Sequence, residues 1–270
     1  MKLLFFLLTI FLISNQLTSS LLDSLKLLGG GGRVVGGYEV KPQFKYTFMI
    51  SIQYKSKQSC GGTIISYNKI LTAAHCTFDD IKDFKVHLHR HDLSKSISDE
   101  GASIYNVTNR LNHPKFKSAA EGYDISIWTI NKEDDKTNTI VYPKLDPGEL
   151  SVKTGLKLFA IGWGRTVEKG DPSNTLLEVQ LPIVDFNKCK NNYKSQGLNL
   201  DINTQLCAGY FEDMQMDTCQ GDSGGPLFIK IEQVYYIVGI VSYGIGCASP
   251  DLPGIYSRVS FLSTFIQENI

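Results

Sequence analysis

Residues 217–226 read DTCQGDSGGP, and this stretch restricts the possible folds of the chain more than any other part of the sequence. Glycines on both sides of Ser223 allow the backbone to form a strained turn that brings another molecule close to the serine Oγ. A serine hydroxyl is a poor nucleophile unless a base lies within hydrogen-bond reach. When that base is a histidine, a carboxylate fixes its tautomer and stabilises its cationic form. The stretch therefore predicts a histidine and an aspartate elsewhere in the chain that complete the site.

His75 is the candidate base and Asp124 is the candidate carboxylate. His75 follows LTAA at residues 71–74 and precedes a cysteine, so packing and a disulfide would hold its ring in place. Asp124 is a lone carboxylate at the start of an apolar run. Taken singly, Asp124 is more typical of a turn before a strand, and His75 is equally well explained as a buried structural histidine. Together with Ser223 they favour nucleophilic catalysis.

The motif GDSGG at residues 221–225 also fits the G-x-S-x-G turn of α/β-hydrolases. Those enzymes carry the serine first, then the acid and then the histidine. Here the order is His75, Asp124, Ser223, and no histidine follows Ser223. The order excludes an α/β-hydrolase.

The composition is that of a folded globular protein. The chain has 270 residues, of which 42% are hydrophobic, and 27 Lys and Arg stand against 27 Asp and Glu. The net charge of zero argues against nucleic-acid binding and against a polybasic membrane surface. Short β-branched and aromatic runs bounded by turn residues indicate an all-β fold. The runs cover residues 46–54, 63–66, 84–88, 125–130, 157–161, 178–183, 227–231 and 235–241.

Two further features organise the chain. The polar stretch 131–139, followed by prolines at 143 and 147, is the best boundary between two halves. Ser260 is a fair N-cap, and apolar residues at 261, 262, 265 and 266 have helical spacing. We therefore expect a short C-terminal helix.

The N-terminus has the pattern of a secretory signal. Lys2 precedes an apolar run at residues 3–13 and small polar residues follow, so we expect residues 1–20 to be a signal peptide. The run is too short to cross a membrane, although an N-terminal anchor is the alternative. Residues 21–33 end in four glycines and Arg33, which predicts an activation propeptide or a plain flexible linker. We expect a secreted, extracellular protein with no membrane association.

Six cysteines in a secreted chain predict three disulfides, and the sequence alone permits 15 pairings. No pair has the C-x-x-C spacing of structural zinc sites, and we expect no metal and no cofactor. His87, His89 and His91 alternate along an expected strand and would share one face. That face could form a metal site but is more typical of an exposed polar surface. Asn106 begins the only N-x-[ST] sequon and is a candidate glycosylation site.

Further motifs occur in order along the chain. They are VVGG at 34–37, CGGT at 60–63, GWG at 162–164, CAG at 207–209, VSYG at 241–244 and PGIY at 253–256. With the strings around His75 and Ser223, they resemble a secreted trypsin-like serine protease of the chymotrypsin family over nearly everything from Val34 to the end. The resemblance implies a protease domain at 34–270 with two six-stranded antiparallel β-barrels, at about 34–140 and 141–258. It also implies an active site in the cleft between the barrels.

The resemblance assigns roles to the residues of that site. His75, Asp124 and Ser223 would form the catalytic triad, and the amides of Gly221 and Ser223 the oxyanion hole. The implied disulfides are Cys60–Cys76, Cys189–Cys207 and Cys219–Cys247.

Specificity and activation follow from the same resemblance. Asp217 would lie at the base of the substrate pocket and attract an Arg or Lys side chain, unless it is only a surface acid. Cleavage after Arg33 would free the amine of Val34, which would pair with Asp222 and complete the pocket. The other substrate-binding residues would be Ser242, Tyr243, Gly244 and Gly254.

Four positions depart from the family pattern, and two of them are Ser126 and Trp128, where many relatives carry Ala and Leu. Tyr243 stands where tryptophan is more frequent and keeps an aromatic wall beside the pocket. Residues 90–100 resemble the calcium loop of many trypsins, but Arg90 replaces an acidic ligand. This replacement argues against calcium binding, although Glu100 remains.

The leading hypothesis is a serine endopeptidase, made as a zymogen, that cleaves after Arg or Lys through an acyl-enzyme. The alternative is a catalytically silent homologue that acts as a binding protein, but such chains usually lack a residue of the triad. The short propeptide favours a digestive over a signalling role. We expect protein or peptide substrates, protein protease inhibitors as further partners, no nucleic acid, and a monomer.

Overall fold

The computed structural model describes residues 36–133, 140–167, 169–211 and 216–270. The expected signal peptide and propeptide, with Arg33 and Val34, lie outside the described residues. Within the described ranges the chain forms fourteen β-strands and two α-helices, so the expectation of a mostly β fold is confirmed. No helix in these ranges is both long and apolar enough to span a membrane.

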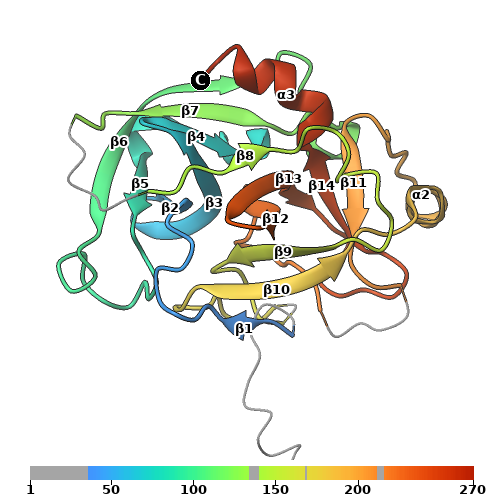
Figure 1. Ribbon diagram of the computed structural model, residues 1–270, viewed down its shortest axis with the longest axis horizontal. Coiled ribbons are helices and arrows are strands. Elements are labelled where there is room, and N and C mark those ends of the chain that lie inside the picture. Colours follow the sequence, from blue (N-terminus) through green and yellow to red (C-terminus); the bar gives the residue numbers. More distant parts are fainter. Residues whose placement is uncertain (1–35, 134–139, 168, 212–215) are drawn as a thin grey trace, which may run out of the picture. The chain divides into compact units, whose positions relative to one another are not determined.

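The first half of the described chain is a closed six-stranded antiparallel barrel with the order β2-β3-β4-β7-β6-β5 (Figure 1). Lys55 and Ser56 join β2 to β3, and both have positive φ, 47° and 65°, as two-residue hairpin turns require. Closure leaves no strand of this sheet with an unpaired edge. The strands are β2 (Met49–Tyr54), β3 (Lys57–Ser66), β4 (Lys69–Thr72), β5 (Phe84–Leu88), β6 (Ser103–Asn112) and β7 (Ser126–Ile130).

The second half is an open sheet and not the expected closed six-stranded barrel. Its order is β1-β10-β9-β12-β13-β14-β11, and β8 pairs with β13 in parallel. Its strands are β1 (Tyr38–Glu39), β8 (Lys144–Leu145), β9 (Lys157–Gly162), β10 (Leu177–Pro182), β11 (Gln205–Ala208), β12 (Pro226–Ile231), β13 (Val234–Tyr243) and β14 (Gly254–Arg258).

The sheet stays open because β10 and β11 meet at a single bridge, between Ile183 and Ala208. Pro182 has no amide hydrogen to extend the ladder. The Gly209 amide donates to the Pro182 carbonyl at 2.9 Å and the Val184 amide donates to the Cys207 carbonyl at 3.1 Å, so the bond that is missing from this ladder is the one that Pro182 cannot donate.

Aromatic side chains join the barrel to the sheet. The Phe48 ring, just before β2, lies 5.3 Å from the Phe228 ring of β12, and the Tyr46 ring lies 5.0 Å from Phe228. Tyr235 of β13 packs against both Phe48 and Phe228. One apolar core therefore continues from the first half into the second.

The two helices differ in how well the sequence predicts them. α2 (Phe186–Ser195) has no counterpart among the predicted elements, and the Asp185 carboxylate caps it by accepting from the Lys188 amide at 2.7 Å. α3 (Val259–Gln267) is the expected C-terminal helix, but it begins before Ser260. Ser260 is therefore not the N-cap, and its Oγ lies 2.9 Å from Ser151 Oγ.

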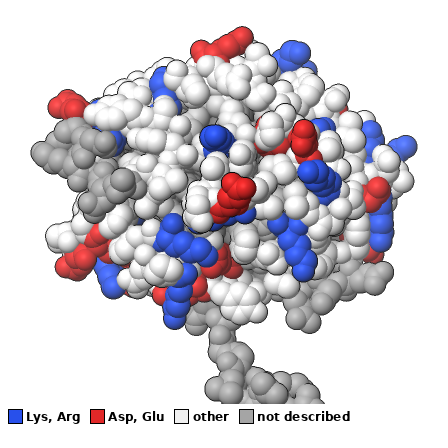
Figure 2. All heavy atoms as spheres, viewed as in Figure 1, with Lys and Arg blue, Asp and Glu red and all other residues white. Residues whose placement is uncertain are grey.

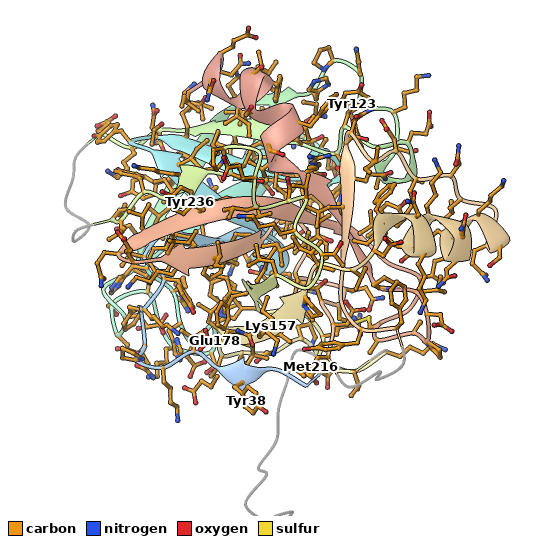
Figure 3. The ribbon with its side chains drawn as sticks, turned by 45° about the vertical axis from the view of Figure 1, so that its right-hand side comes forward. Tyr38, Tyr123, Lys157, Glu178, Met216 and Tyr236 are labelled. Atoms are coloured by element: carbon orange, nitrogen blue, oxygen red, sulfur yellow. A yellow bond between two sulfur atoms is a disulfide. The ribbon has the colours of Figure 1, made fainter. Side chains whose placement is uncertain are left out.

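The first described strand is attached to the second sheet. Tyr38 pairs with Glu178 on β10, and both residues are labelled in the lower part of the view in Figure 3. The Glu178 carboxylate accepts from the Tyr46 hydroxyl and lies 3.1 Å from Lys45 Nζ. On the face shown in Figure 2, charges of both signs are interspersed, as the balanced composition implies.

Candidate active site

His75 and Asp124 lie side by side in the first half. His75 is in the short 3₁₀ helix η1 (Ala74–Cys76), and Asp124 precedes β7 by two residues. His75 Nδ1 lies 2.7 Å from Asp124 Oδ2, and the His75 amide donates to Oδ1 at 2.9 Å. The Asp124 side chain is 1% exposed and that of His75 29%. A carboxylate at Nδ1 favours a hydrogen on that nitrogen, which leaves Nε2 of His75 as a base facing solvent or a ligand.

The second half supplies further hydrogen bonds to Asp124. Ser242 Oγ of β13 donates to Asp124 Oδ2 at 2.6 Å, and Ser257 Oγ of β14 donates to the Asp124 carbonyl at 2.7 Å. A buried carboxylate without such donors would be costly. Docking of the two halves therefore fixes the carboxylate that orients His75.

Ser223 lies in the turn before β12. Gly221 and Gly224 flank it with φ of 103° and 79°, a region in which only glycine is free of strain. A Cβ on Gly224 would lie 2.1 Å from Thr72 Oγ1, and the Ser223 carbonyl accepts from the Gly61 amide of β3 at 2.8 Å. The turn is therefore pressed against the first barrel. In the described part of the chain, no acceptor meets the amides of Gly221 and Ser223.

His75 and Ser223 line one cavity of about 360 Å³. The two halves of the molecule both contribute to its walls. The other lining residues are Ala119, Thr218, Cys219, Gln220, Val241, Ser242, Tyr243, Gly244, Gly246, Cys247 and Gly254.

Asp217 lies behind the wall of this cavity and is 5% exposed. Its carboxylate accepts from the amides of Thr218 and Ala248 at 2.8 and 2.9 Å. A Cβ on Gly254 would lie 3.1 Å from Asp217 Oδ1, so this glycine of the cavity wall lies directly against the carboxylate. Burial raises the pKa of Asp217 to about 7, and the two amide bonds oppose that rise.

Asp222 is 1% exposed and points away from Ser223, its neighbour in sequence, toward the GWG motif. Its carboxylate accepts from the amides of Gly164 and Cys219 at 2.8 and 3.0 Å. A Cβ on Gly162 would lie 2.1 Å from Asp222 Oδ1, so glycine is required where the carboxylate packs. Burial raises the pKa of Asp222 to about 6, again against the effect of the two amides.

Residues 34–266 match the family model described as Trypsin. The chain belongs to the trypsin family of serine proteases. It is 33% identical to the venom serine protease Bi-VSP of Bombus ignitus over 89% of its own length and 68% of the relative's. It is 34% identical to the proclotting enzyme of Tachypleus tridentatus, covering 88% of the chain and 66% of the relative. A trypsin of Saccharopolyspora erythraea is 33% identical, with 88% and 98% covered. The chain thus spans about two thirds of the first two relatives and nearly all of the third.

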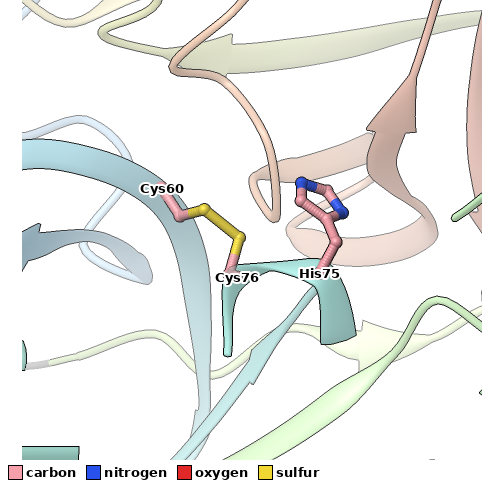
Figure 4. Close-up of side chains that lie close together, drawn as sticks. All are labelled: Cys60, His75 and Cys76. Atoms are coloured by element: carbon pink, nitrogen blue, oxygen red, sulfur yellow. A yellow bond between two sulfur atoms is a disulfide. The ribbon is translucent and has the colours of Figure 1, made fainter. Parts of the chain in front are cut away.

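Three disulfides are present in this trypsin-family chain. Cys60–Cys76 lies beside the His75 ring and ties η1 to β3 (Figure 4). Cys219–Cys247 joins two segments of the cavity wall. With Cys189–Cys207, these are the pairs that the family resemblance implies.

Among the described residues, one group of His, Cys, Asp and Glu side chains is compact enough to hold a metal ion, and it consists of Cys60, His75 and Cys76. Both of its sulfurs are disulfide-bonded. Because the sulfur ligand of a metal is a thiolate, this group does not fit a metal site.

The three histidines at 87, 89 and 91 do not share an exposed face, so that expectation is wrong. β5 ends at Leu88, and His89 has a φ of 58°, which breaks the alternation of a strand. His87 and His91 are 8% and 0% exposed. His91 Nε2 lies 3.1 Å from Glu39 Oε1, and burial lowers the pKa of His87 to about 4.

The Arg90 side chain fills the centre of the 90–100 loop. Its Nε lies 2.9 Å from Glu100 Oε2, and its Nη2 donates to the carbonyls of Asp92 and Lys95 at 3.0 and 2.8 Å. Arg90 and Glu100 are 5% and 6% exposed. The guanidinium is therefore a fixed cation at the point where a carboxylate and two carbonyls converge.

Two residues beside the cavity carry no sequence signal that could have identified them. Ala119 lines the cavity, and Gln205 lies behind it with its amide near Tyr243. Neither belongs to a motif. Asn106, the candidate glycosylation site, is exposed on β6 and is not among the cavity residues.

Proposed function

We propose that this trypsin-family protein is a serine endopeptidase that hydrolyses peptide bonds after Arg or Lys. The observation that carries the proposal is the single cavity lined by His75 and Ser223, with the buried Asp217 carboxylate beside its Gly254 wall. A protease family implies protein or peptide substrates.

Catalysis would proceed through an acyl-enzyme. Ser223 Oγ attacks the scissile carbonyl while His75 Nε2 accepts its proton, and Asp124 stabilises the imidazolium at Nδ1. His75 then protonates the leaving amine, and a water activated by His75 releases the acid product. The amides of Gly221 and Ser223, which meet no acceptor among the described residues, support an oxyanion hole, in which one donor contributes about 3 kcal/mol in the transition state.

Specificity would come from the charge on Asp217. A Lys or Arg head in contact with this carboxylate gains about 4 kcal/mol at an effective dielectric constant of 20. An apolar side chain would leave the buried charge without a partner. Gly244 supports this assignment, because the space around its missing Cβ is open up to the Gly246 carbonyl, 3.6 Å away.

Synthesis as a secreted zymogen is the second part of the proposal. Residues 1–20 would be a signal peptide and 21–33 a propeptide cleaved after Arg33. The new Val34 amine would then pair with Asp222, whose buried carboxylate has amide partners but no cation among the described residues. The three disulfides support an extracellular location. The relatives named above are a venom protease, a proclotting enzyme and a trypsin, and digestion stays a prediction.

The test is hydrolysis of chromogenic peptides ending in Arg, Lys, Phe or Leu, before and after cleavage at Arg33. We expect turnover of the Arg and Lys peptides only, and only after cleavage. Ser223→Ala should lower kcat by a factor of about 10⁶. Turnover of Phe or Leu peptides would refute the role of Asp217. No turnover from a folded chain with a free Val34 amine would refute the enzyme and favour the silent binding protein.

A further inference from the structure

Gln205, the first residue of β11, connects two walls of the cavity and is 2% exposed. Its Nε2 donates to the carbonyls of Ala119 and Ala120 at 3.3 and 3.4 Å and to the Tyr243 hydroxyl at 3.4 Å. Its Oε1 accepts from the Asp201 amide at 2.9 Å, which fixes the orientation of the group. One side-chain amide therefore touches the first half and the second half of the molecule at the same time.

The wall on the first-half side is the 3₁₀ helix η3 (Ala119–Glu121). Ala119 and Ala120 have only methyl side chains, so at these positions the loop must be held through its backbone. Gly122 has a φ of 82°, and a Cβ there would lie 2.3 Å from Thr204 Oγ1. The loop thus rests directly on the residue before Gln205. A shift of Gln205 would be transmitted to Ala119 without an intervening layer.

The wall on the second-half side is Tyr243, which is held at two points. Its ring packs edge-on against Tyr193, with centroids 6.2 Å apart, and the Tyr193 hydroxyl donates to the Pro253 carbonyl at 2.9 Å. The second point is the Tyr243 hydroxyl, which accepts a hydrogen bond from Gln205 Nε2. Burial raises the pKa of Tyr243 to about 12, so the hydroxyl is neutral near pH 7.

We propose that Gln205 is a positioning residue that sets the separation between Ala119 and Tyr243 and thereby the affinity for the part of a peptide that precedes the cleaved bond. The inference rests on the proposed function. The residue whose side chain enters toward Asp217 belongs to the acyl half of the substrate. Ala119 and Tyr243 line the same cavity as His75 and Ser223, so they are placed to contact the residues before this one as those residues leave the cavity.

This role predicts a dependence on substrate length. A peptide with a single Arg occupies the Asp217 end of the cavity and does not extend between Ala119 and Tyr243. A peptide with three residues before that Arg does extend between them. Gln205 therefore affects KM for the long substrate and leaves kcat for both substrates unchanged.

The experiment compares the cleaved wild type with Gln205→Met, which keeps the length of the side chain and removes its hydrogen bonds. For the long substrate we expect KM to rise about fivefold to tenfold, as the loss of one or two ordinary hydrogen bonds would cause. For the single-Arg substrate we expect KM and kcat to change by less than about twofold. Gln267→Met, the same chemical change at an exposed position of α3, is the matched control and should alter neither substrate.

The outcomes separate the two proposals. If the cleaved wild type hydrolyses neither substrate, the proposed function fails. If it hydrolyses both and Gln205→Met changes KM equally for the two, or not at all, the role of Gln205 is refuted. Should Gln205→Met fail to fold, Tyr243→Phe removes only the partner hydroxyl and must reproduce the selective rise in KM for the long substrate. In the double variant, the two effects should not add, because both remove the same contact.

Discussion

Buried carboxylates have different partners in the 90–100 loop and in the stretch around Ser223. In the loop, Glu100 has the Arg90 guanidinium 2.9 Å away. Around Ser223, Asp217 and Asp222 are 5% and 1% exposed, and each has two backbone amides but no cation within the described residues. An uncompensated buried charge is costly. The first region is therefore complete by itself, whereas the second would gain from a cation that arrives from outside, either a substrate or a new N-terminus.

The largest effect should follow from neutralising Asp217, the carboxylate that would bind the substrate. Asp217→Asn should lower kcat/KM for an Arg peptide by about a thousandfold, which corresponds to the 4 kcal/mol of a contact ion pair at an effective dielectric constant of 20. The Phe peptide, which the wild type should not hydrolyse, should show no such fall, because its side chain never used the charge. Steady-state kinetics on both peptides measure the change, with Asp171→Asn on an exposed loop as the control. An Arg preference that survives the substitution would contradict the view that the Asp217 carboxylate receives its cation from the substrate.

Removal of the internal cation should act on stability alone. Arg90→Met leaves Glu100 buried without its partner, so the free energy of unfolding should fall by about 3 kcal/mol. Urea unfolding monitored by fluorescence gives this value. The kcat/KM of the cleaved enzyme for the Arg peptide should stay unchanged, and Arg90→Met with Glu100→Gln should recover part of the loss. A full activity loss in a folded Arg90→Met variant would mean that the loop also serves the site.

Asp222→Asn should lower activity and leave stability unchanged, which is the opposite of the effect expected for Arg90→Met. After cleavage at Arg33, the Val34 amine would lack its anionic partner, and kcat for the Arg peptide should fall about a hundredfold, as when one oxyanion-hole donor is lost. The uncleaved chain should not be destabilised at pH 7. The native-state pKa of Asp222, about 6, lies above the usual aspartate value. The ionised Asp222 carboxylate therefore opposes folding at pH 7. Thermal unfolding of the uncleaved variant decides this point, and a clear fall in Tm would be the contrary result.

The sequence predicted those features that local chemistry determines. We could propose His75, Asp124 and Ser223 as a catalytic group because nucleophilic catalysis needs these residue types. The glycines around Ser223 also indicate a turn at this position. The positive φ of Gly221 and Gly224 agrees with that expectation. The mostly β character followed from short β-branched and aromatic runs bounded by turn residues, for the same local reason.

The features that were missed depend on tertiary placement. Gln205 and Ala119 are 86 residues apart, and no local pattern marks a contact between them. The second sheet was expected to close, but its last ladder is interrupted at Pro182. The histidines were misjudged because period-2 alternation was carried past Leu88, where His89 turns the chain with a positive φ. In each case one backbone or packing feature determined the structure, and the local sequence pattern does not contain that feature.

The smallest predicted effect is a pH dependence of ligand binding that distinguishes the two regions. The pKa of Asp217 is raised to about 7, so its carboxylate becomes neutral as the pH falls through that value. A small amidine that competes for this site should therefore bind more weakly, by about tenfold per pH unit below 7. Calorimetry on the cleaved Ser223→Ala variant isolates this binding from turnover. In the Asp217→Asn variant the pH slope should vanish. Arg90→Met should keep it, because Glu100 and its loop do not face the cavity. A slope of the same size in Asp217→Asn would assign the titration to another group, and the comparison between the two regions would then lose its electrostatic basis.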